Sequence, residues 1–244
     1  IFFIDDTQIS SMEGVKRQLH PARKHEGNPL VTSDKDWEAP AILLGTVRKE
    51  GNQYRMWYQS QATCPGANTL DSYRRFLHLY AESEDGLSWT KPALGFYEDS
   101  MGSYENNIAF VRLNLSKDMN PSVLYTPHMD HGRAYTMLTY GSGYDMPYSG
   151  YVLAYSDDGI RWTDGPKTPA IPGYGDIGWF TYDEEDGILR GTVTWDRVPG
   201  PAWTQSPDGH EWALPWPALL PDQEDKKWAG GDPSSSTVFH GMPV

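Results

Sequence analysis

The sequence has one cysteine, Cys64, among its 244 residues. An intrachain disulfide is therefore excluded, and cysteine usage does not indicate a cellular compartment. Basic residues are also scarce: 20 Lys and Arg stand against 33 Asp and Glu, giving a formal net charge of −13 and a pI near 4.8. Because phosphate binding needs clustered Lys and Arg, this balance argues against nucleic acid or an anionic membrane as partner. A neutral or cationic ligand fits better.

Long apolar runs are missing as well. No run is long enough for a transmembrane helix, and long amphipathic helical patterns are absent. No signal peptide precedes Ile1, and the strand-like start at 1–4 is expected of a mature or truncated chain. What the sequence does contain is 10 Trp, 15 Tyr, 24 Gly and 19 Pro, which suit short strands joined by turns. We expect one all-β domain over 1–244.

A short pattern, S-x-D-G-x-x-W, occurs three times, at 83–89, 156–162 and 206–212. Asp-Gly tolerates the positive φ of a tight turn, and each copy follows an apolar, β-rich stretch, so each pattern predicts a β-hairpin. The copies start 73 and 50 residues apart, a spacing that suits four-stranded propeller blades. The closing Trp would pack over its hairpin. The alternative is a β-sandwich with similar hairpins.

The apolar stretches divide among three blades. We expect strands of the first blade at 41–48, 54–58 and 76–82. Those of the second blade are expected at 107–111, 135–140 and 151–155, with a loop rich in Pro and Asp after the first of them. The third blade is expected to use 178–182 and 188–195, and 237–244 looks like the first strand of a fourth. Because an unclosed propeller exposes an edge strand, we expect the sequence to be part of a longer protein.

Several segments carry a family resemblance. They include F-I-D-D at 3–6, Y-R-M-W-Y at 54–58, E-N-N at 105–107, the three turns, and G-M-P-V at 241–244. With these, nearly the whole chain resembles bacterial secreted proteins of the glycoside hydrolase family 32/43 propeller superfamily. The family 32 signatures W-M-N-D-P-N-G, R-D-P and E-C are absent. The resemblance implies a five-bladed β-propeller, a glycan pocket at the centre of one end, and a secreted or periplasmic location.

The resemblance also implies one acidic residue from each of several inner strands. The acids that precede the expected inner strands are Glu38, Glu105, Asp176 and Asp232. By blade order in the resembling enzymes, Glu38 would be nucleophile or base, Glu105 the orienting and pKa-tuning carboxylate, and Asp176 the acid. Glycoside hydrolysis needs such a set, with one carboxyl protonated and another ionised. An Asp here replaces the Glu that usually serves as acid.

Neighbouring residues complete the expected site. Trp37, Tyr104 and Trp179 flank the acids and would stack on sugar rings, although packing between blades is the alternative. Asn106 or Asn107 would bind sugar hydroxyls, or cap a turn, and Asp232 would contact substrate. His25 and Arg55 would line the same funnel, unless Arg55 points outward from its strand. His128 and His131 lie outside any metal-binding motif, so no metal or cofactor is expected.

Three function classes remain open at this stage. A glycoside hydrolase acting on a poly- or oligosaccharide is our expectation, a non-catalytic glycan-binding propeller is the alternative, and a sialidase-like enzyme is a weaker third. A sialidase needs clustered Arg to bind a carboxylate, and the sequence does not place such a cluster near its strand starts. The Gly and Trp that follow Asp85, Asp158 and Asp208 place them at hairpin turns, so we assign them structural roles. A phosphorylase would need a basic phosphate site, which the sequence does not show. Oligomeric state, sugar, linkage and stereochemistry do not follow from the sequence.

Overall fold

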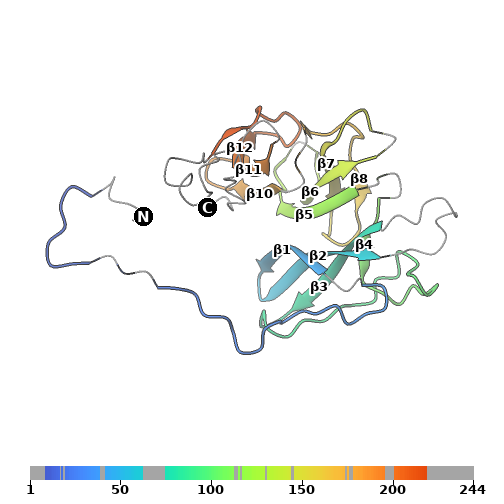
Figure 1. Cartoon of the computed structure of the whole chain (residues 1–244). Helices are drawn as coiled ribbons and strands as arrows, with labels where there is room; N and C mark the ends of the chain where they lie inside the picture. The colour runs from blue at the N-terminus through green and yellow to red at the C-terminus, as the bar shows by residue number, and fades with distance from the viewer. Residues whose placement is uncertain are drawn as a thin grey trace, which may run out of the picture.

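The computed structural model describes residues 9–16, 18, 20–38, 42–62, 75–112, 115, 117–129, 131–143, 146–173, 175, 178–195 and 201–218. In these residues the chain forms 13 β-strands arranged in three antiparallel sheets (Figure 1). Within the same ranges, no helix has the length and hydropathy needed to cross a membrane. The all-β prediction is therefore confirmed.

The first sheet has the order β1-β2-β3-β4. Its strands are β1 (Ile42–Glu50), β2 (Gln53–Ala62), β3 (Arg75–Ser83) and β4 (Ile108–Phe110). A tight turn at Gly51, with φ of 61°, joins β1 to β2. Because side chains alternate along β2, Trp57 faces the second sheet while Met56 and Tyr58 face the other way.

The second and third sheets repeat this plan. The second contains β5 (Lys117–Tyr125), β6 (Tyr135–Ser142), β7 (Gly150–Ser156), β8 (Thr163–Asp164) and β9 (Ile171–Pro172), with β8 and β9 both paired to β7. The third contains β10 (Gly178–Asp183), β11 (Ile188–Thr194), β12 (Pro201–Ser206) and β13 (Trp216–Pro217), in that order. Each sheet therefore has three longer strands and a short outer edge.

The first strands of the three sheets, β1, β5 and β10, lie next to one another. Thr46 Oγ1 donates to the Pro121 carbonyl at 3.3 Å, and each of these residues is the fifth of its strand. A Cβ atom on Gly45 would lie 2.6 Å from the same carbonyl, so this approach requires glycine. Ser122 Oγ donates to the Gly178 carbonyl at 3.5 Å. These contacts place the three inner strands side by side, and we call the end of the molecule at which β5 begins the leading end.

The prediction for the inner strand of the second blade is wrong. Residues 107–111 were expected there, but 108–110 form β4, which pairs with β3 at the outer edge of the first sheet. The true inner strand, β5, contains Asn120 at φ of 57° and Pro121, where the pairing with β6 shifts register. A bulge with Asn and Pro looks like a loop in sequence, whereas all of β4 is buried and apolar.

The three repeated patterns form the same turn. In each, Ser Oγ accepts a hydrogen bond from the Gly N–H, at 2.9, 2.8 and 2.8 Å for Ser83, Ser156 and Ser206. The Asp of each pattern accepts hydrogen bonds from the two N–H groups that follow the Gly. These bonds hold Asp85, Asp158 and Asp208 at the ends of the third strands, away from the leading end, so the predicted structural role is confirmed.

Two apolar cores lie between the sheets. The core between the first and second sheets contains Trp57, Tyr80, Phe110, Met137 and Trp162. The core between the second and third contains Leu138, Tyr151, Leu153, Phe180 and Leu189, among others. Successive sheets pack face to face, and their inner strands lie next to one another. This is the arrangement of propeller blades, and it confirms the predicted architecture.

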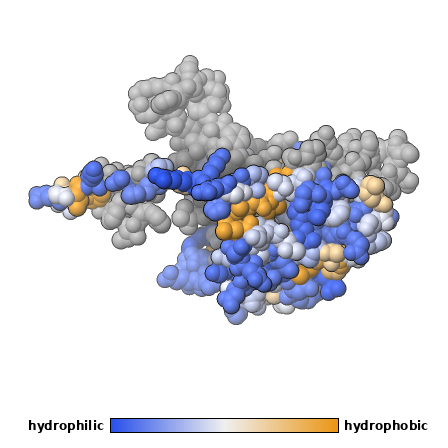
Figure 2. All heavy atoms as spheres, turned by 90° about the horizontal axis from the view of Figure 1, so that it is seen from below, coloured by the Kyte–Doolittle hydropathy of each residue, from blue (hydrophilic) through white to orange (hydrophobic). Residues whose placement is uncertain are grey.

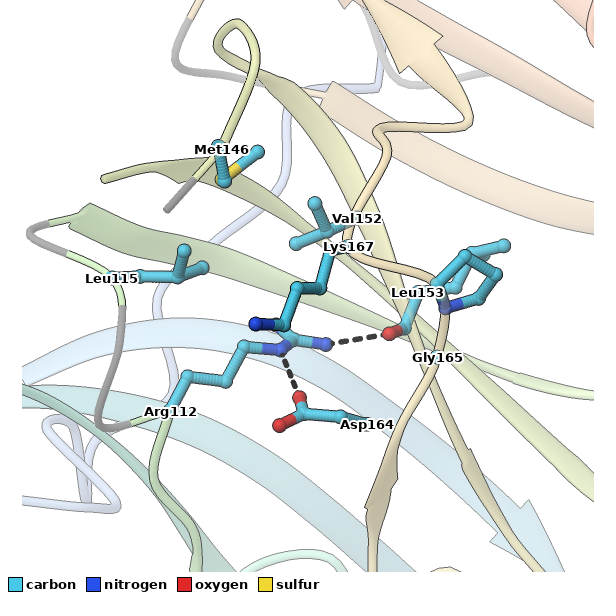
Figure 3. Close-up of a pocket in the computed structure, with 9 residues that line it drawn as sticks. Arg112, Leu115, Met146, Val152, Leu153, Asp164, Gly165 and Lys167 are labelled. Atoms are coloured by element: carbon cyan, nitrogen blue, oxygen red, sulfur yellow. Dashed lines mark hydrogen bonds and ion pairs between the residues drawn. The ribbon is translucent and has the colours of Figure 1, made fainter. Parts of the chain in front are cut away.

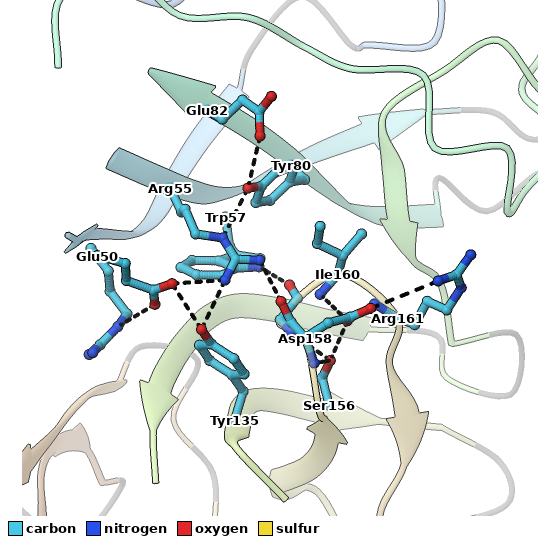
Figure 4. A network of polar contacts seen from close by, with 12 residues as sticks. Glu50, Arg55, Trp57, Tyr80, Glu82, Tyr135, Ser156, Asp158, Ile160 and Arg161 are labelled. Carbon is cyan, nitrogen blue, oxygen red and sulfur yellow. Dashed lines mark hydrogen bonds and ion pairs between the residues drawn. The ribbon is translucent and has the colours of Figure 1, made fainter. Parts of the chain in front are cut away.

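A polar network around Arg55 also joins the first two sheets (Figure 4). The Arg55 guanidinium donates to Glu50, Tyr80 and Tyr135 at 2.9 Å each and to the Asp158 carbonyl at 2.6 Å. Trp57 Nε1 donates to the Gly159 carbonyl at 2.6 Å. Arg55 is 8 % exposed, so neither the funnel nor the outward orientation considered for it is correct. It fixes the second Asp-Gly turn to the first sheet.

The other face of the first sheet is covered by the chain that precedes it. The described residues between 9 and 38 form an extended arm and then run along the underside of this sheet (Figure 1). There Val31 and Trp37 pack against a core that includes Met56, Tyr58 and Leu79. Seen from below, the surface is mainly hydrophilic, with hydrophobic residues in small separate groups (Figure 2).

Candidate functional site

Asp118 is the acidic residue that the topology places at the leading end of the second sheet. It is the second residue of β5 and is 2 % exposed. Arg112 Nη1 donates to its Oδ1 at 2.7 Å, and His78 Nε2 lies 2.8 Å from its Oδ2. Gln59 Nε2 donates to the Asp118 backbone carbonyl at 2.6 Å. Two side chains of the first sheet, His78 and Gln59, and the nearby Arg112 therefore converge on the start of this inner strand.

This cluster keeps Asp118 ionised. Burial alone would raise its pKa, but the charge of Arg112 and the contact with His78 outweigh burial and hold the pKa well below its ordinary value of 3.8. Because an ionised carboxylate only accepts hydrogen bonds, His78 Nε2 carries the proton it shares with Asp118. The other ring nitrogen, Nδ1, is buried and has no hydrogen-bond partner in the described part of the chain.

Arg112 extends the cluster to a hollow of about 130 Å³ at the same end of the second sheet (Figure 3). Its Nε donates to Asp164 at 2.7 Å and its Nη2 donates to the Leu153 carbonyl at 2.8 Å. The Lys167 side chain lies beside the guanidinium, and apolar walls come from Leu115, Met146 and Val152. One guanidinium thus bridges a buried carboxylate and a surface carboxylate.

Glu38, the predicted nucleophile or base, is held by a second cation. Lys91 Nζ donates to both of its carboxylate oxygens at 2.8 Å, and Tyr58 donates to Oε1 at 2.6 Å. The N–H groups of Asp34 and Lys35 donate to Oε2. Burial and the nearby Glu38 raise the pKa of the Tyr58 hydroxyl, so this hydroxyl stays a donor. The catalytic role of Glu38 stays a prediction, and these bonds occupy both of its oxygens.

Glu105 does not precede an inner strand, as the sequence analysis expected. It lies exposed in the loop before β4, at the outer edge of the first sheet. Tyr104 beside it is 54 % exposed. The assumed blade position of Glu105 is therefore wrong, because the strand it precedes is the outermost strand and not the innermost. Asp118 occupies the position that Glu105 was expected to fill.

The predicted sugar-binding residues of this region bind one another. Trp37 Nε1 donates to Asn107 Oδ1 at 2.9 Å, and Asn107 Nδ2 donates to Tyr58 and to the Tyr80 carbonyl at 2.7 Å each. Asn106 Nδ2 donates to the carbonyls of Tyr97 and Ser103. Both Asn side chains are buried. Their contact with sugar stays a prediction, and the described contacts are those of a folded loop.

The remaining predicted residues belong to the third blade or follow it. Trp179 lies on the inner strand β10 and is partly exposed. Asp176 and Asp232 lie outside the described residues, as does the expected strand at 237–244. Over the ranges that the structure describes, no group of three or more His, Cys, Asp and Glu is arranged to hold a metal ion.

Sequence reasoning missed Asp118, Arg112 and His78, yet one signal pointed to them. A hairpin from 111 to 135 needs a connection of more than 20 residues, whereas hairpin loops usually have about two to five. The apolar run Val123–Leu124 stands much closer to the second strand at Tyr135. Loop length therefore favours β5 as the inner strand, with Lys117-Asp118 at its start.

Solved structures show which known fold this is. The chain is similar to a fructofuranosidase from Schwanniomyces occidentalis bound to fructose (TM-score 0.51, 12 % identity, covering 70 % of this chain and 33 % of that one). A glycosyl hydrolase from Bacteroides ovatus gives a TM-score of 0.50 with 15 % identity, covering 82 % of this chain and 57 % of that one. An exo-inulinase from Aspergillus awamori gives 0.51 with 14 % identity, covering 73 % and 38 %. The chain has the fold of the β-propeller glycoside hydrolases.

At these identities the similarity shows the fold alone. The chain spans less than two thirds of the length of each of these structures. No protein-family model and no curated protein matches the sequence. The activity therefore has to be argued from the residues at the leading end.

Proposed function

We propose that this propeller is a glycoside hydrolase that acts on a poly- or oligosaccharide at its leading end. The observation that carries the proposal is Asp118, an ionised carboxylate at the start of an inner strand, held by Arg112 and His78. Propeller glycosidases share this fold, and glycoside hydrolysis depends on carboxyl groups in contrasting protonation states. A secreted or periplasmic location, which the family resemblance implies, belongs to the same proposal.

Each carboxyl group has a separate role in this proposal. Asp176 gives its proton to the glycosidic oxygen as the bond to the anomeric carbon breaks. Glu38 attacks that carbon or removes a proton from the attacking water. Either role requires Lys91 to release one carboxylate oxygen of Glu38. Asp118 replaces Glu105 as the orienting carboxylate. Because Asp118 stays ionised, its negative charge stabilises the positive charge that develops on the sugar ring.

A second candidate function is glycan binding without turnover. The observation that favours it is the saturation of Glu38, whose oxygens accept hydrogen bonds from Lys91, Tyr58 and two backbone N–H groups. If these bonds persist when sugar binds, the first blade supplies no free base. The fold and a sugar site would then remain without hydrolysis.

A panel of plant and algal oligosaccharides separates the two functions. Wild type, Glu38→Gln and Asp176→Asn are each assayed for binding and for sugar release. Release by wild type, with a loss of about 100-fold or more in each variant and retained binding, supports the hydrolase. Binding without release by all three proteins supports the binding function. Neither binding nor release across the panel contradicts both.

A further inference from the structure

The hollow beside Arg112 combines apolar walls with a small number of polar groups (Figure 3). The apolar side chains that line it are those of Leu115, Met146, Val152, Leu153 and Pro166. Its volume of about 130 Å³ is that of roughly four water molecules. Apolar walls with a few polar groups are typical of sites for small ligands or for one substituent of a larger ligand.

Two cations in this hollow have hydrogen-bond donors without partners. Arg112 is 7 % exposed, and four of its five N–H groups donate, to two carboxylates, a hydroxyl and a carbonyl. One N–H of its Nη2 therefore has no partner among the described residues. Lys167, which lies beside the guanidinium, is exposed and forms no ion pair within the described part of the chain. Both cations are therefore able to donate to a ligand.

The charges around the hollow favour a neutral ligand. Arg112 and Lys167 are positive, and the carboxylates of Asp118 and Asp164 both bind Arg112, so these four groups carry no net charge. A carboxylate or sulfate in the hollow would add a negative charge without a matching cation, in a chain whose formal charge is already −13. A neutral hydrogen-bond acceptor does not have this cost.

Arg112 also connects the hollow to the proposed orienting carboxylate. Its Nη1 donates to Asp118 Oδ1 at 2.7 Å, and its Nη2 donates at 2.8 Å to the carbonyl of Leu153, which lines the hollow. A single guanidinium therefore separates Asp118 from the hollow. A sugar that lies at Asp118 is close enough to place one of its substituents in the hollow.

We propose that this hollow is a subsite for an acetyl group carried by the sugar substrate. The acetyl carbonyl accepts hydrogen bonds from Lys167 and from the remaining N–H of Arg112, and the methyl group packs against Met146 and Val152. An O-acetyl ester and an N-acetyl amide share this chemistry. The inference rests on the proposed function, because the sugar has to bind at the leading end.

Binding of matched sugars tests the subsite separately from hydrolysis. The ester arm compares acetylated xylo- and manno-oligosaccharides with the same sugars after mild alkaline deacetylation. The amide arm compares N-acetylated with de-N-acetylated glucosamine oligosaccharides. Isothermal titration calorimetry gives the dissociation constants, and saturation-transfer NMR detects contact between the acetyl methyl group and the protein. We expect the acetylated sugar of one arm to bind wild type about tenfold more tightly than its deacetylated form.

Three variants locate this preference in the hollow. Lys167→Met removes a donor and Met146→Gln removes part of an apolar wall, and each should reduce the acetyl preference about fivefold. Lys117→Met is the matched control, because Lys117 is an exposed cation at the same end of the second sheet that does not line the hollow. The acetyl preference of Lys117→Met should equal that of wild type.

Three results would overturn the subsite. The first is a lack of acetyl preference in both arms, even if wild type hydrolyses the sugars. The second is an acetyl preference that Lys167→Met and Met146→Gln leave unchanged, which would place the acetyl group elsewhere. The third is tighter binding of galacturonate oligosaccharides that Lys167→Met abolishes, which would make the hollow an anion subsite. An acetyl preference that both variants reduce, without sugar release by wild type, would support the subsite and contradict only the hydrolase.

Discussion

The second Asp-Gly turn differs from the first and third in the partner of one carbonyl group. In the first and third turns the closing Trp donates to the Gly carbonyl of its own turn, Trp89 to Gly86 at 3.1 Å and Trp212 to Gly209 at 2.9 Å. In the second turn the Gly159 carbonyl accepts from Trp57 of the preceding sheet. The second closing residue, Trp162, is buried and its Nε1 has no described partner.

The difference shows how one motif serves two purposes. The Ser and Asp bonds are the same in all three copies, so the local sequence determines the turn itself. What the turn contacts depends on the preceding sheet. Arg55 and Trp57 of the first sheet donate hydrogen bonds to the second turn. The equivalent positions of the second sheet, which precedes the third turn, are Thr136 and Leu138. The contact between the first and second blades thus adds a network of hydrogen bonds to its apolar core, whereas the contact between the second and third is mainly apolar.

Removing Arg55 should break this contact most strongly. Arg55→Ala deletes bonds to Glu50, Tyr80, Tyr135 and the Asp158 carbonyl and leaves Glu50 without its main cation. We expect a loss of about 3 kcal/mol in the free energy of unfolding, measured in urea. The control is Arg161→Ala, whose side chain is 75 % exposed and whose loss should stay within about 0.5 kcal/mol. Equal effects would contradict a special role for Arg55.

Replacing the turn glycines by alanine should show which turn is packed closely against the neighbouring sheet. Gly86 and Gly159 both have φ of 74°, so alanine costs about 1 kcal/mol at either position. At Gly159 a Cβ would also lie 2.9 Å from Arg55 Nη2, whereas at Gly86 the nearest atom is 3.5 Å away. We expect a loss of about 2 kcal/mol for Gly159→Ala and about 1 kcal/mol for Gly86→Ala. Thermal unfolding of both variants measures the difference, and identical midpoints would refute it.

A pair of Trp substitutions isolates the single hydrogen bond. Trp57→Phe and Trp162→Phe remove the same atoms from one buried core, but only Trp57 donates across the interface. Trp57→Phe should therefore cost about 1 kcal/mol more in the free energy of unfolding. Chemical denaturation of the two variants gives this difference directly. A larger loss from Trp162→Phe would show that the bond to Gly159 is unimportant.

The smallest effect concerns the pH dependence of the same interface. Burial raises the pKa of Glu50, but bonds from Arg55 and Tyr135 outweigh it and leave the pKa below its ordinary value of 4.5. The ionised form therefore stabilises the fold above pH 4.5, and this contribution is lost as the pH falls through the lowered pKa. The free energy of unfolding of wild type should exceed that of Glu50→Gln by about 0.5 kcal/mol at pH 7. The two values should converge below pH 4.5. If this difference in free energy of unfolding instead grows as the pH falls, the expected direction of the pH dependence is wrong.

Much of the fold followed from local patterns. Residues 54–58, 76–82 and 188–195 fall in or largely within strands because they combine β-forming residues with nearby turns, and the Asp-Gly turns predicted the hairpins. The strand β5 did not follow, since Asn120 and Pro121 have the composition of a loop. That one error also moved the expected orienting acid from Asp118 to Glu105.

The contacts of the candidate site could not be predicted from the sequence. His78 and Asp118 are 40 residues apart, and Gln59 and Asp118 are 59 apart, so each contact depends on how separate sheets pack. Glu38 was predicted as nucleophile or base, and nothing near it in sequence indicates that Lys91 binds it. Long-range pairing of charges is decided by sheet register, which local propensity does not specify.

The most direct test of the account compares Asp118→Asn with Glu105→Gln. Both proteins are assayed for sugar release on the oligosaccharide that wild type degrades best, after circular dichroism confirms that each is folded. We predict a loss of about 100-fold or more in turnover for Asp118→Asn and activity near that of wild type for Glu105→Gln. Full activity in Asp118→Asn together with lost activity in Glu105→Gln would contradict the assignment of the leading end as the active site.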